Sequence, residues 1–222
     1  MNNICVLIPS YNEARTIGRI VRDVRELGLP AYVVDDGSAD DTAVIAAKEG
    51  AIVVKHAQNM GKGASVREGF KHALKKKFDA VIIMDGDNQH EVSSIPDFIK
   101  TMEATGADIV IGNRMSDTAD MPWVRRKTNR FMSFFISKRC GQYVPDTQCG
   151  YRLIKRRVLE SLELDSSKFE IESELIIKAC RKGFRIAAVP IKTVYQDEKS
   201  RINPIVDTLR FIALVIKMDS KK

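Results

Sequence analysis

The sequence has few cysteines, and they form no recognisable pattern. Four occur in 222 residues without any C-x-x-C pair: Cys5, Cys140, Cys149 and Cys180. Zinc sites and small disulfide-stapled folds depend on regular cysteine spacings, so we expect neither a zinc site nor a disulfide framework. A reducing cytosol is the simplest setting for such a chain.

The sequence also lacks a long hydrophobic run. The main apolar stretch near the C-terminus, residues 211–216, lies between Arg210 and Lys217, whereas a membrane-spanning helix needs roughly 20 apolar residues. The first residues lack the basic start, apolar stretch and small-residue cleavage site of a signal peptide. We therefore expect neither a membrane span nor a secretory leader.

The composition is that of a soluble globular protein with an excess of positive charge. The chain is long enough to bury one sizeable core, and it carries a formal net charge of +7. A basic protein suits an acidic partner, which is a nucleic acid, an anionic lipid or a phosphorylated substrate. Bulk charge does not choose among the three.

Short apolar runs alternate with amphipathic patterns over the first 115 residues. The apolar runs predict strands at residues 4–8, 32–34, 52–54, 80–84 and 108–111. Helical spacing predicts helices at residues 17–27, after Asp40 or Asp41, at 62–76 and at 94–105. This alternation predicts a single α/β domain with a mostly parallel, Rossmann-like sheet flanked by helices.

Polar clusters follow three of the predicted strands. They are Pro9-Ser10-Tyr11-Asn12-Glu13, Asp35-Asp36-Gly37-Ser38 and Asp85-Gly86-Asp87-Asn88-Gln89-His90. In open α/β sheets, ligands bind beyond the carboxyl ends of the strands, near the point where the strand order reverses. We therefore expect the three clusters to meet at one edge of the sheet and to form the site.

The sequence Asp85-Gly86-Asp87 suits a divalent cation. Residues two apart in an extended segment point to the same side, about 6–7 Å apart. Two carboxylates in one cleft repel each other unless a cation offsets their charge. Mg²⁺ or Mn²⁺ meets this need and also binds a diphosphate, with Gln89 and His90 in reach as further ligands. Alone, the sequence fits an ordinary turn; its place after a buried strand favours the metal site.

Two other segments are ambiguous from their residues alone. Asp35-Asp36-Gly37-Ser38 is either an ordinary turn or a carboxylate site for a nucleobase or ribose. Asn59-Met60-Gly61-Lys62-Gly63 is similar to a phosphate-binding loop, but it lacks both G-x-x-x-x-G-K-[ST] and G-x-G-x-x-G. The glycines therefore favour a close backbone approach beside the site over a P-loop.

Taken in order, the motifs resemble those of a family 2 glycosyltransferase with the GT-A fold. Five motifs carry the resemblance: Ile8-Pro9-Ser10-Tyr11-Asn12-Glu13, Val34-Asp35-Asp36-Gly37-Ser38, Asn59-x-Gly61-Lys62-Gly63, Asp85-x-Asp87-x-Gln89-His90 and Gly112-Asn113-Arg114. Later segments resemble its dolichol-phosphate mannosyltransferase branch: Asp146-x-x-Cys149-Gly150-Tyr151-Arg152, Phe169-Glu170 and Ser200-Arg201. The resemblance covers nearly the whole chain. It departs from the common pattern at Gly86, where alanine is usual, and at Cys149, where serine is usual.

The resemblance implies roles for individual residues. The nucleotide-binding positions are Pro9, Tyr11, Asn12, Glu13, Asp36, Gly37, Lys62, Asp85 and Gly86. The metal positions, for Mg²⁺ or Mn²⁺, are Asp85, Asp87 and Gln89. Arg114 and Arg201 match basic residues that meet the donor or acceptor phosphates, and with Asp87 they make up the expected catalytic set. The implied donor is a nucleotide sugar, GDP-mannose or a UDP-sugar.

The implied reaction is an inverting transfer of a hexose, mannose or glucose, to a polyprenyl (dolichyl) phosphate. A divalent cation and a guanidinium stabilise the leaving nucleoside diphosphate. A lipid phosphate is already anionic and needs no strong base, so we expect basic and hydroxyl groups to orient it: Arg114, Arg130, Ser200 and Arg201. A hydroxyl acceptor would require a base, for which Asp146 and Glu172 are the candidates.

A basic and aromatic stretch at residues 123–139 predicts a helix at a membrane surface. It contains six Lys or Arg residues and no acidic residue, interleaved with phenylalanines. An ordinary amphipathic helix on the core is the alternative. The aromatic residues do not form a base-stacking platform, so we do not expect a nucleic-acid partner. A second apolar helix, predicted at residues 204–218, caps the core, lies on the membrane or joins a membrane subunit. We expect peripheral attachment to the cytoplasmic face of a membrane.

No linker rich in Pro, Gly or Ser divides the chain, so we expect one domain over residues 1–222. Residues 1–115 would form the nucleotide-sugar half, 116–201 the acceptor-side half and 202–222 an amphipathic helix. The second half contains a predicted strand pair at residues 185–195 and a helix with Glu170, Glu172 and Glu174, which form either part of the site or a charged face.

Two other functions remain open. One is a family 2 transferase that acts on a glycan or another hydroxyl acceptor. The other is a non-catalytic module that binds a nucleotide or a lipid surface. The full set of Asp85, Asp87, Gln89 and Arg201 argues against the second, because a module without catalysis has no need of it.

Overall fold

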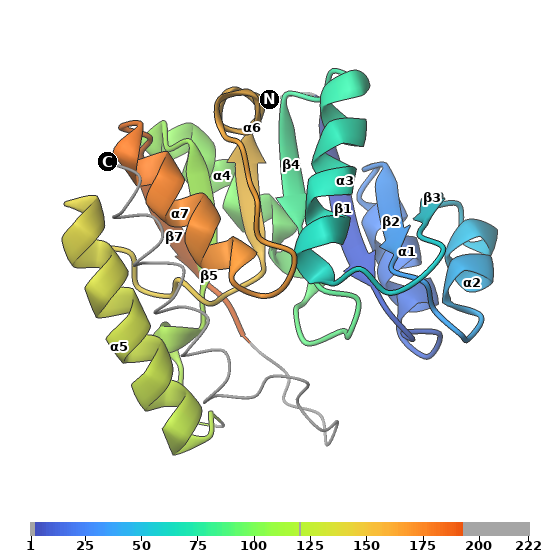
Figure 1. The fold of residues 1–222 in the computed structure, drawn as a ribbon, viewed down its shortest axis with the longest axis horizontal. Coiled ribbons are helices and arrows are strands. Elements are labelled where there is room, and N and C mark those ends of the chain that lie inside the picture. Colours follow the sequence, from blue (N-terminus) through green and yellow to red (C-terminus); the bar gives the residue numbers. More distant parts are fainter. Residues whose placement is uncertain (1–2, 120, 193–222) are drawn as a thin grey trace.

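In the computed structural model, which describes residues 3–119 and 121–192, one seven-stranded sheet runs through both halves of the chain (Figure 1). The strand order is β3-β2-β1-β4-β6-β5-β7. Every neighbouring pair is parallel except the two pairs that involve β6. The strands are β1 (Ile4–Ser10), β2 (Ala31–Asp35), β3 (Ile52–Lys55), β4 (Ala80–Ile83), β5 (Ile109–Asn113), β6 (Arg152–Lys155) and β7 (Ile186–Pro190). The predicted α/β fold with a mostly parallel sheet is confirmed.

The central strands are apolar because both of their faces are covered. Every residue of β1, β2 and β4 is buried, which explains why their sequences are continuous apolar runs without alternation. The edge strand β3 is partly exposed. All five strands predicted in the first 115 residues are present, although β4 ends at Ile83, one residue before the predicted end.

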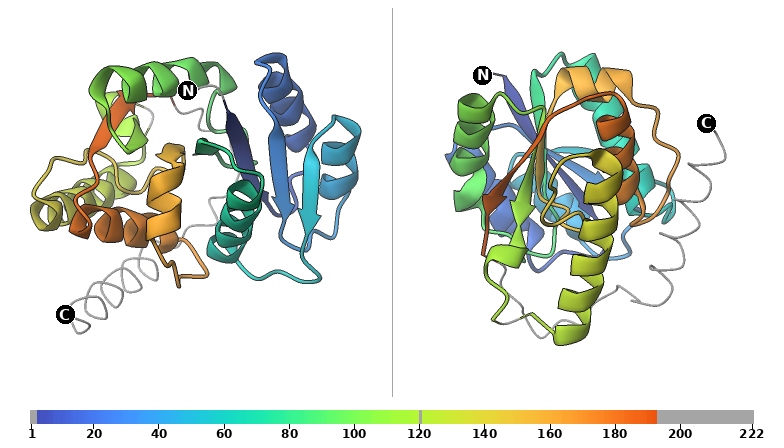
Figure 2. Two further views of the ribbon diagram at one scale, coloured as in Figure 1. Left: turned by 90° about the horizontal axis from the view of Figure 1, so that it is seen from above. Right: turned by 90° about the vertical axis from the view of Figure 1, so that its left-hand side faces the viewer.

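Helices cover both faces of the sheet (Figure 2). The helices α1 and α4 lie on one face, while α3, α6 and α7 lie on the other, and α5 packs against α7. Their bounds are α1 (Ile17–Glu26), α2 (Thr42–Lys48), α3 (Lys62–Lys75), α4 (Ile95–Thr105), α5 (Trp123–Cys140), α6 (Arg156–Ser161) and α7 (Ile171–Arg181). Two short 3₁₀ helices, η1 (Val92–Ser94) and η2 (Arg114–Ser116), precede α4 and follow β5. The four helices predicted in the first half and the helix predicted at residues 123–139 are confirmed.

The antiparallel strand β6 was not predicted, and it is the element that brings the second half to the site. It lies between β4 and β5, and its first residue, Arg152, pairs with Ile83 of β4 and Ile111 of β5. An antiparallel strand begins at the edge where its parallel neighbours end. The segment that leads into β6, residues 146–150, is therefore delivered to the carboxyl edge of the sheet.

The end of the described chain differs in part from the prediction. The strand pair expected at residues 185–195 is represented by β7, which pairs in parallel with β5. Residues 193–195 lie outside the described residues, as do Ser200, Arg201 and the helix predicted at residues 204–218. Within residues 3–119 and 121–192, no helix combines the length and the apolar character that crossing a bilayer requires.

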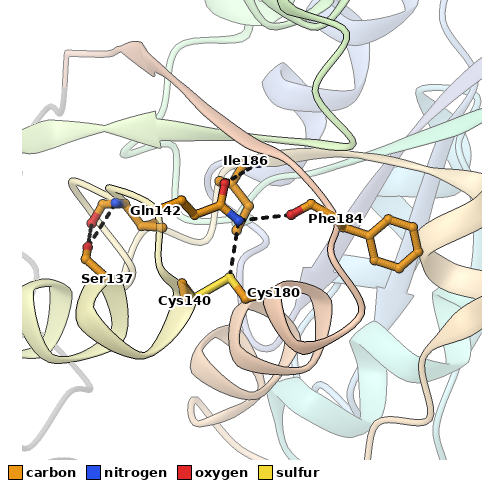
Figure 3. The surroundings of a disulfide bond; sticks show 7 residues. Ser137, Cys140, Gln142, Cys180, Phe184 and Ile186 are labelled. Atoms are coloured by element: carbon orange, nitrogen blue, oxygen red, sulfur yellow. Dashed lines mark hydrogen bonds between the residues drawn. A yellow bond between two sulfur atoms is a disulfide. The ribbon is translucent and has the colours of Figure 1, made fainter.

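A disulfide joins the C-terminal ends of α5 and α7, although the cysteine spacing predicted no disulfide framework (Figure 3). Cys140 and Cys180 are bonded, with their Cα atoms 5.1 Å apart. Gln142 sits beside the bond, where its amide donates to the carbonyl oxygen of Phe184 at 2.9 Å and accepts from the amide of Ile186 at 3.0 Å. The two cysteines are 40 residues apart, so their pairing depends on the packing of two helices and leaves no spacing signal.

Candidate active site

A cavity of about 450 Å³ opens at the carboxyl edge of the sheet, where the strand order reverses between β1 and its two neighbours. One side, which we call the strand-end wall, comes from the end of β1, from the segments after β1, β2, β3 and β4, and from the start of α3. Its residues are Pro9, Ser10, Tyr11, Glu13, Asp36, Asn59, Gly61, Lys62, Ser65, Asp85, Gly86, Asp87, Gln89 and His90. The prediction that three polar clusters meet at one edge of the sheet is confirmed.

The other side, which we call the opposing wall, comes from residues after β5. Its residues are Arg114, Arg125, Thr128, Asn129, Met132, Gln148, Gly150, Lys168, Phe169 and Glu172. They belong to η2, α5, the segment before β6, the segment that leads into α7 and the first turn of α7. The cavity is therefore enclosed by two walls that are far apart in the sequence.

The carboxylate of Asp36 organises the glycine-containing loop before α3. Its oxygens accept hydrogen bonds from the backbone amides of Met60 and Gly61, both at 2.8 Å, and one of them lies 2.8 Å from Nδ1 of His56. Gly61 has a φ of 94°, and a Cβ there would collide with the carbonyl oxygen of Ser167. The loop therefore needs a glycine because it packs closely against the opposing wall.

Asn12 and Gly37 lie behind the cavity, where they join two loops of the strand-end wall. The side-chain oxygen of Asn12 accepts a hydrogen bond from the backbone amide of Ala39 at 2.9 Å, and the backbone amide of Asn12 donates to Oγ of Ser38 at 2.9 Å. Gly37 has a φ of 75°, and a Cβ there would lie 2.5 Å from the backbone of Gln58. In this geometry the two residues support the nucleotide-binding positions predicted around them.

Lys62 connects the two walls through a pair of short ion pairs. Its Nζ lies 2.6 Å from Oδ1 of Asp85 on the strand-end wall and 2.6 Å from Oε1 of Glu172 on the opposing wall. Burial alone would lower the pKa of Lys62, but the two carboxylates outweigh burial and raise it. Burial would likewise raise the pKa of Asp85, but the ammonium of Lys62 outweighs burial and lowers it. Lys62 and Asp85 are therefore charged at neutral pH.

The donor set on the strand-end wall fits an open divalent-metal site. Asp85, Asp87 and Gln89 all line the cavity and offer the oxygen atoms that Mg²⁺ and Mn²⁺ prefer. Within the part of the chain that the structure describes, no three His, Cys, Asp or Glu side chains gather into a metal-binding group, so this site has only two carboxylate ligands. Two carboxylates and an amide thus leave room for further ligands, as in a site that a diphosphate completes.

Arg114 and Asp146 form a buried ion pair at the edge of the opposing wall. Nε and Nη2 of Arg114 lie 2.7 and 2.9 Å from the two oxygens of Asp146, and its backbone amide donates to the same carboxylate at 3.2 Å. Burial alone would raise the pKa of Asp146, but Arg114 outweighs burial and lowers it. Asp146 therefore fixes the direction of a guanidinium that lines the cavity.

Arg152 holds the opposing wall together from inside the core. It is 1% exposed, and its guanidinium donates to three carbonyl oxygens, those of Thr147, Cys149 and Glu172, at 2.7–2.8 Å. These bonds tie the segment before β6 to the first turn of α7. Glu172 lines the cavity from this turn. Gly150 packs against Asp85 and Lys62, because a Cβ there would lie 2.8 Å from Oδ2 of Asp85 and 2.9 Å from Nζ of Lys62.

Two of the three glutamates at the start of α7, Glu172 and Glu174, do not form a charged face. Glu172 lines the cavity, and Glu174 is 2% exposed. Glu174 accepts hydrogen bonds from the amides of Asp165 and Ser166 and lies 2.6 Å from Nζ of Lys178. It thus fixes the loop that packs against Gly61. The alternative that these glutamates are part of the site and its support is the one that fits their burial.

His90 is a buried histidine at the base of the cavity. Desolvation lowers its pKa to about 4, so the imidazole is neutral at physiological pH. The ring packs against Tyr151, with centroids 5.3 Å apart. Among the described residues its Nδ1 has no hydrogen-bond partner. A neutral ring of this kind can accept a hydrogen bond from a ligand.

The helix α5 contributes four residues to the cavity, and none of them was predicted from the sequence. Arg125, Thr128, Asn129 and Met132 recur at helical spacing and line the cavity. Arg130, predicted to bind a phosphate, is exposed, and it is not among the cavity-lining residues of α5. The helical periodicity of the basic stretch would have shown that Arg125 and Arg130 lie on different faces of the helix.

The chain is similar in sequence to several known proteins. A family model described as "Glycosyl transferase family 2" matches residues 5–163. A polyprenol monophosphomannose synthase of Mycolicibacterium smegmatis is 30% identical over 84% of this chain and 75% of its own length. A UDP-N-acetylglucosamine–dolichyl-phosphate N-acetylglucosaminyltransferase of Methanococcus voltae is 29% identical over 87% of this chain and 86% of its own length.

A solved structure shares the fold at lower identity. Glucosyl-3-phosphoglycerate synthase from Mycobacterium tuberculosis, in complex with Mn²⁺, uridine diphosphate and phosphoglyceric acid, superposes with a TM-score of 0.71. The alignment covers 97% of this chain and 78% of that one at 21% sequence identity. The shared fold is the GT-A fold that the motif order implies.

Proposed function

This chain belongs to glycosyl transferase family 2, and we propose that it transfers a hexose, mannose or glucose, from a nucleotide sugar to a polyprenyl phosphate in a metal-dependent reaction. The observation that carries the proposal is the pairing of two walls in one cavity. Oxygen ligands for a metal lie on the strand-end wall, and arginines that suit a phosphate lie on the opposing wall. A cation-bound donor and an anionic acceptor can therefore meet between them.

The strand-end wall would hold the donor. Pro9, Tyr11, Glu13 and Asp36 follow the first two strands and line the cavity. Asp85, Asp87 and Gln89 would hold Mg²⁺ or Mn²⁺, which would offset the charge of the leaving diphosphate. The solved M. tuberculosis synthase with the same fold was crystallised with Mn²⁺ and uridine diphosphate, which supports a metal and a nucleotide as the ligands of this fold.

The opposing wall would hold the acceptor. Arg114 is fixed by Asp146, so its guanidinium is pre-oriented for a phosphate, and Arg125 lines the cavity from α5. A phosphate monoester is anionic at neutral pH and attacks without a strong base. The two relatives described above are named for polyprenol and dolichyl-phosphate substrates. We assign Arg130 to the exposed face of the helix; Arg201, outside the described residues, stays a proposed phosphate ligand.

The outer face of α5 suits a membrane surface. Trp123, Phe131 and Phe134 are 63%, 58% and 69% exposed, and Lys127 and Lys138 share the same face at helical spacing. Such a face can insert aromatic rings at the headgroup level while each lysine gains about 1 kcal/mol near an anionic leaflet. Because the same helix lines the cavity, a lipid phosphate could enter while its chain stays in the membrane. We propose peripheral attachment at the cytoplasmic face, by α5 alone or with a membrane subunit.

The first test is turnover of GDP-mannose, UDP-glucose and UDP-N-acetylglucosamine, with and without a polyprenyl phosphate and with Mg²⁺, Mn²⁺ or a chelator. We expect release of one nucleotide that requires both the lipid and the metal. Turnover that needs no lipid would overturn the acceptor assignment. A protein that binds none of these nucleotides would overturn the donor site itself.

The arginine assignment is tested separately. We expect Arg125→Ala to raise the KM for the lipid phosphate by about tenfold or more, since an arginine–phosphate pair is lost, while the KM for the donor stays the same. Arg130→Ala is the matched control on the same helix and should change binding to anionic vesicles more than the KM. Equal effects of the two variants on the KM would argue against a distinct phosphate site at Arg125.

A hydroxyl acceptor is the second candidate, and the position of Glu172 favours it. Both predicted bases are ion-paired, Glu172 with Lys62 and Asp146 with Arg114, but only Glu172 lines the cavity, so it is the better placed of the two. A product that is lipid-free and stable to alkali would support this candidate. If Glu172→Gln loses turnover but the reaction still requires the lipid phosphate, the result does not support a hydroxyl acceptor. A phosphate acceptor needs no base, so Glu172 would then act in another way.

A further inference from the structure

Lys62 occupies an unusual position for a residue of a metal-binding cleft. Its ammonium lies 2.6 Å from Asp85 and 2.6 Å from Glu172, and its side chain is only 15% exposed. Asp85 is one of the expected metal ligands, so a cationic group of the protein already neutralises a carboxylate that a metal would use. This contact joins the segment directly after β4, which carries Asp85, to the first residue of α3 and the first turn of α7.

The charges of this cluster determine what can bind beside it. Two carboxylates and one ammonium carry a local net charge of −1. A divalent cation that approached Asp85 alone would face the ammonium at short range, and like charges a few ångströms apart repel strongly in a partly buried site. A diphosphate that arrives with the cation brings negative charge, which offers the ammonium a new partner.

We propose that Lys62 is a resident competitor of the divalent cation, which keeps Asp85 paired in the empty site and makes metal binding depend on the simultaneous arrival of the nucleotide diphosphate. The inference rests on the proposed metal–nucleotide site and adds a coupling between its two ligands. Free metal binds weakly because it must displace or repel Lys62. Metal with a nucleotide binds well because Lys62 transfers its charge interaction from Asp85 to the diphosphate.

This coupling has two consequences of opposite sign in Lys62→Met. The affinity for Mn²⁺ alone should rise by about tenfold or more, because the competing charge is gone. The affinity for UDP or GDP in the presence of saturating Mn²⁺ should fall by about tenfold, because the diphosphate loses a cationic partner. A residue with a purely structural role would weaken both. Titration of Mn²⁺ by electron paramagnetic resonance measures the first affinity. Calorimetric titration of UDP or GDP at saturating Mn²⁺ measures the second, and neither needs turnover.

Two further variants keep the result interpretable. Lys168→Met removes another lysine that lines the cavity and should leave the affinity for Mn²⁺ alone within about twofold of the wild type. Lys62→Met leaves two carboxylates unpaired in a partly buried site and could fail to fold. The double variant Lys62→Met/Glu172→Gln removes one of these charges, and we expect it too to bind Mn²⁺ alone more tightly than the wild type.

The outcomes separate this inference from the proposed function. If the wild type binds Mn²⁺ together with UDP or GDP, and the Lys62 variants bind Mn²⁺ alone no more tightly than the wild type, the competition is disproved and the proposed function stands. If the wild type binds no Mn²⁺ even with either nucleotide present, the proposed metal–nucleotide site itself fails. Tighter binding of Mn²⁺ alone, together with weaker binding of the nucleotide, supports the inference.

Discussion

The two walls of the cavity are built in different ways. The strand-end wall consists of short segments that follow neighbouring parallel strands, so the sheet alone places its side chains together. The opposing wall is assembled from η2, α5, the segment before β6 and the start of α7. It is held by the buried Arg114–Asp146 pair, by Arg152 and by the disulfide between α5 and α7.

The difference indicates how each wall should respond to substitution. On the strand-end wall, Asp36 and Lys62 hold loops and walls together, but the other side chains mostly reach the cavity from the ends of strands. Replacement of one of these others should reduce activity while stability remains. On the opposing wall, several polar groups are buried partners of one another, and removal of one leaves the other unsatisfied. Substitutions there should reduce stability as well as activity.

The largest effect is expected on the strand-end wall, from Asp87→Ala. The half-buried Asp87 lines the cavity as a proposed metal ligand, so turnover should fall by about 10³-fold or more. The free energy of unfolding should change by less than about 1 kcal/mol. Steady-state turnover and urea unfolding measure the two quantities, with the exposed Asp97→Ala on α4 as control. A large loss of stability would contradict the proposed contrast between the walls.

The matching experiment on the opposing wall is Asp146→Ala. This change leaves the guanidinium of Arg114, which is 4% exposed, without its carboxylate. Loss of one partner of a buried ion pair costs about 3–5 kcal/mol of stability. Urea unfolding should show this loss, and Asp165→Ala, at an exposed position, provides the control. A stable but inactive Asp146→Ala protein would show that Asp146 acts in the reaction and is not a support of the wall.

The disulfide should contribute less. Replacement of Cys140 and Cys180 by serine should lower the free energy of unfolding by about 2–4 kcal/mol, because the bond restricts the unfolded chain. Reduction of the wild type should produce a similar loss, whereas the double-serine variant should not respond to reductant. If reductant leaves the thermal midpoint of the wild type unchanged, the bond does not support the opposing wall.

Stability should also depend on acid pH through Asp146. Its pKa is lowered in the folded protein because Arg114 outweighs the effect of burial. A depressed carboxyl pKa stabilises the fold above the unfolded-state pKa, near 3.9, and this contribution is lost as the pH falls through the lower folded-state value. Urea unfolding between pH 6 and pH 3 should therefore show a decline that is smaller in Asp146→Asn. Identical pH profiles would assign acid sensitivity to other groups.

The smallest effects come from a pair of glycines, one on each wall. A Cβ at Gly150 would lie 2.8 Å from Oδ2 of Asp85 and 2.9 Å from Nζ of Lys62, so Gly150→Ala should disturb both ion pairs and reduce turnover by about tenfold. A Cβ at Gly86 would lie 2.7 Å from Oγ of Ser10, a hydroxyl that can rotate away. Gly86→Ala should therefore change turnover by less than about twofold. A reversal of this order would show that the packing around Gly86 is the tighter of the two.

Much of the strand-end wall was predictable from local sequence. Continuous apolar runs identified β1, β2 and β4, and the polar residues directly after each run lie in the cavity. This prediction succeeds because the side chains at strand ends follow from the strands themselves. The family resemblance then gave Asp85, Asp87 and Gln89 their expected roles. What local sequence did not indicate was the contact of Lys62 with Asp85, because α3 and β4 are separate elements.

The opposing wall was predictable only in part. The basic stretch correctly indicated α5, but the choice of Arg130 ignored the helical phase that directs Arg125 to the cavity. The short strand β6 gave no clear signal, and neither did the pairing of Cys140 with Cys180. Each of these features depends on contacts between residues that are far apart in the chain. Sequence patterns report periodicity within one element, not which element lies beside it.

By itself, the sequence determined the parallel α/β order of the first half, the edge at which the site forms and the ordered motifs of a glycosyltransferase. These follow from local periodicity and from the fixed geometry of parallel strands. Only the tertiary structure decided that an antiparallel strand delivers residues 146–150 to this edge, that Asp146 serves Arg114, and that Lys62 spans both walls. Buried charges choose their partners by proximity in the packed core, and that proximity exists only once both halves have folded around the same sheet.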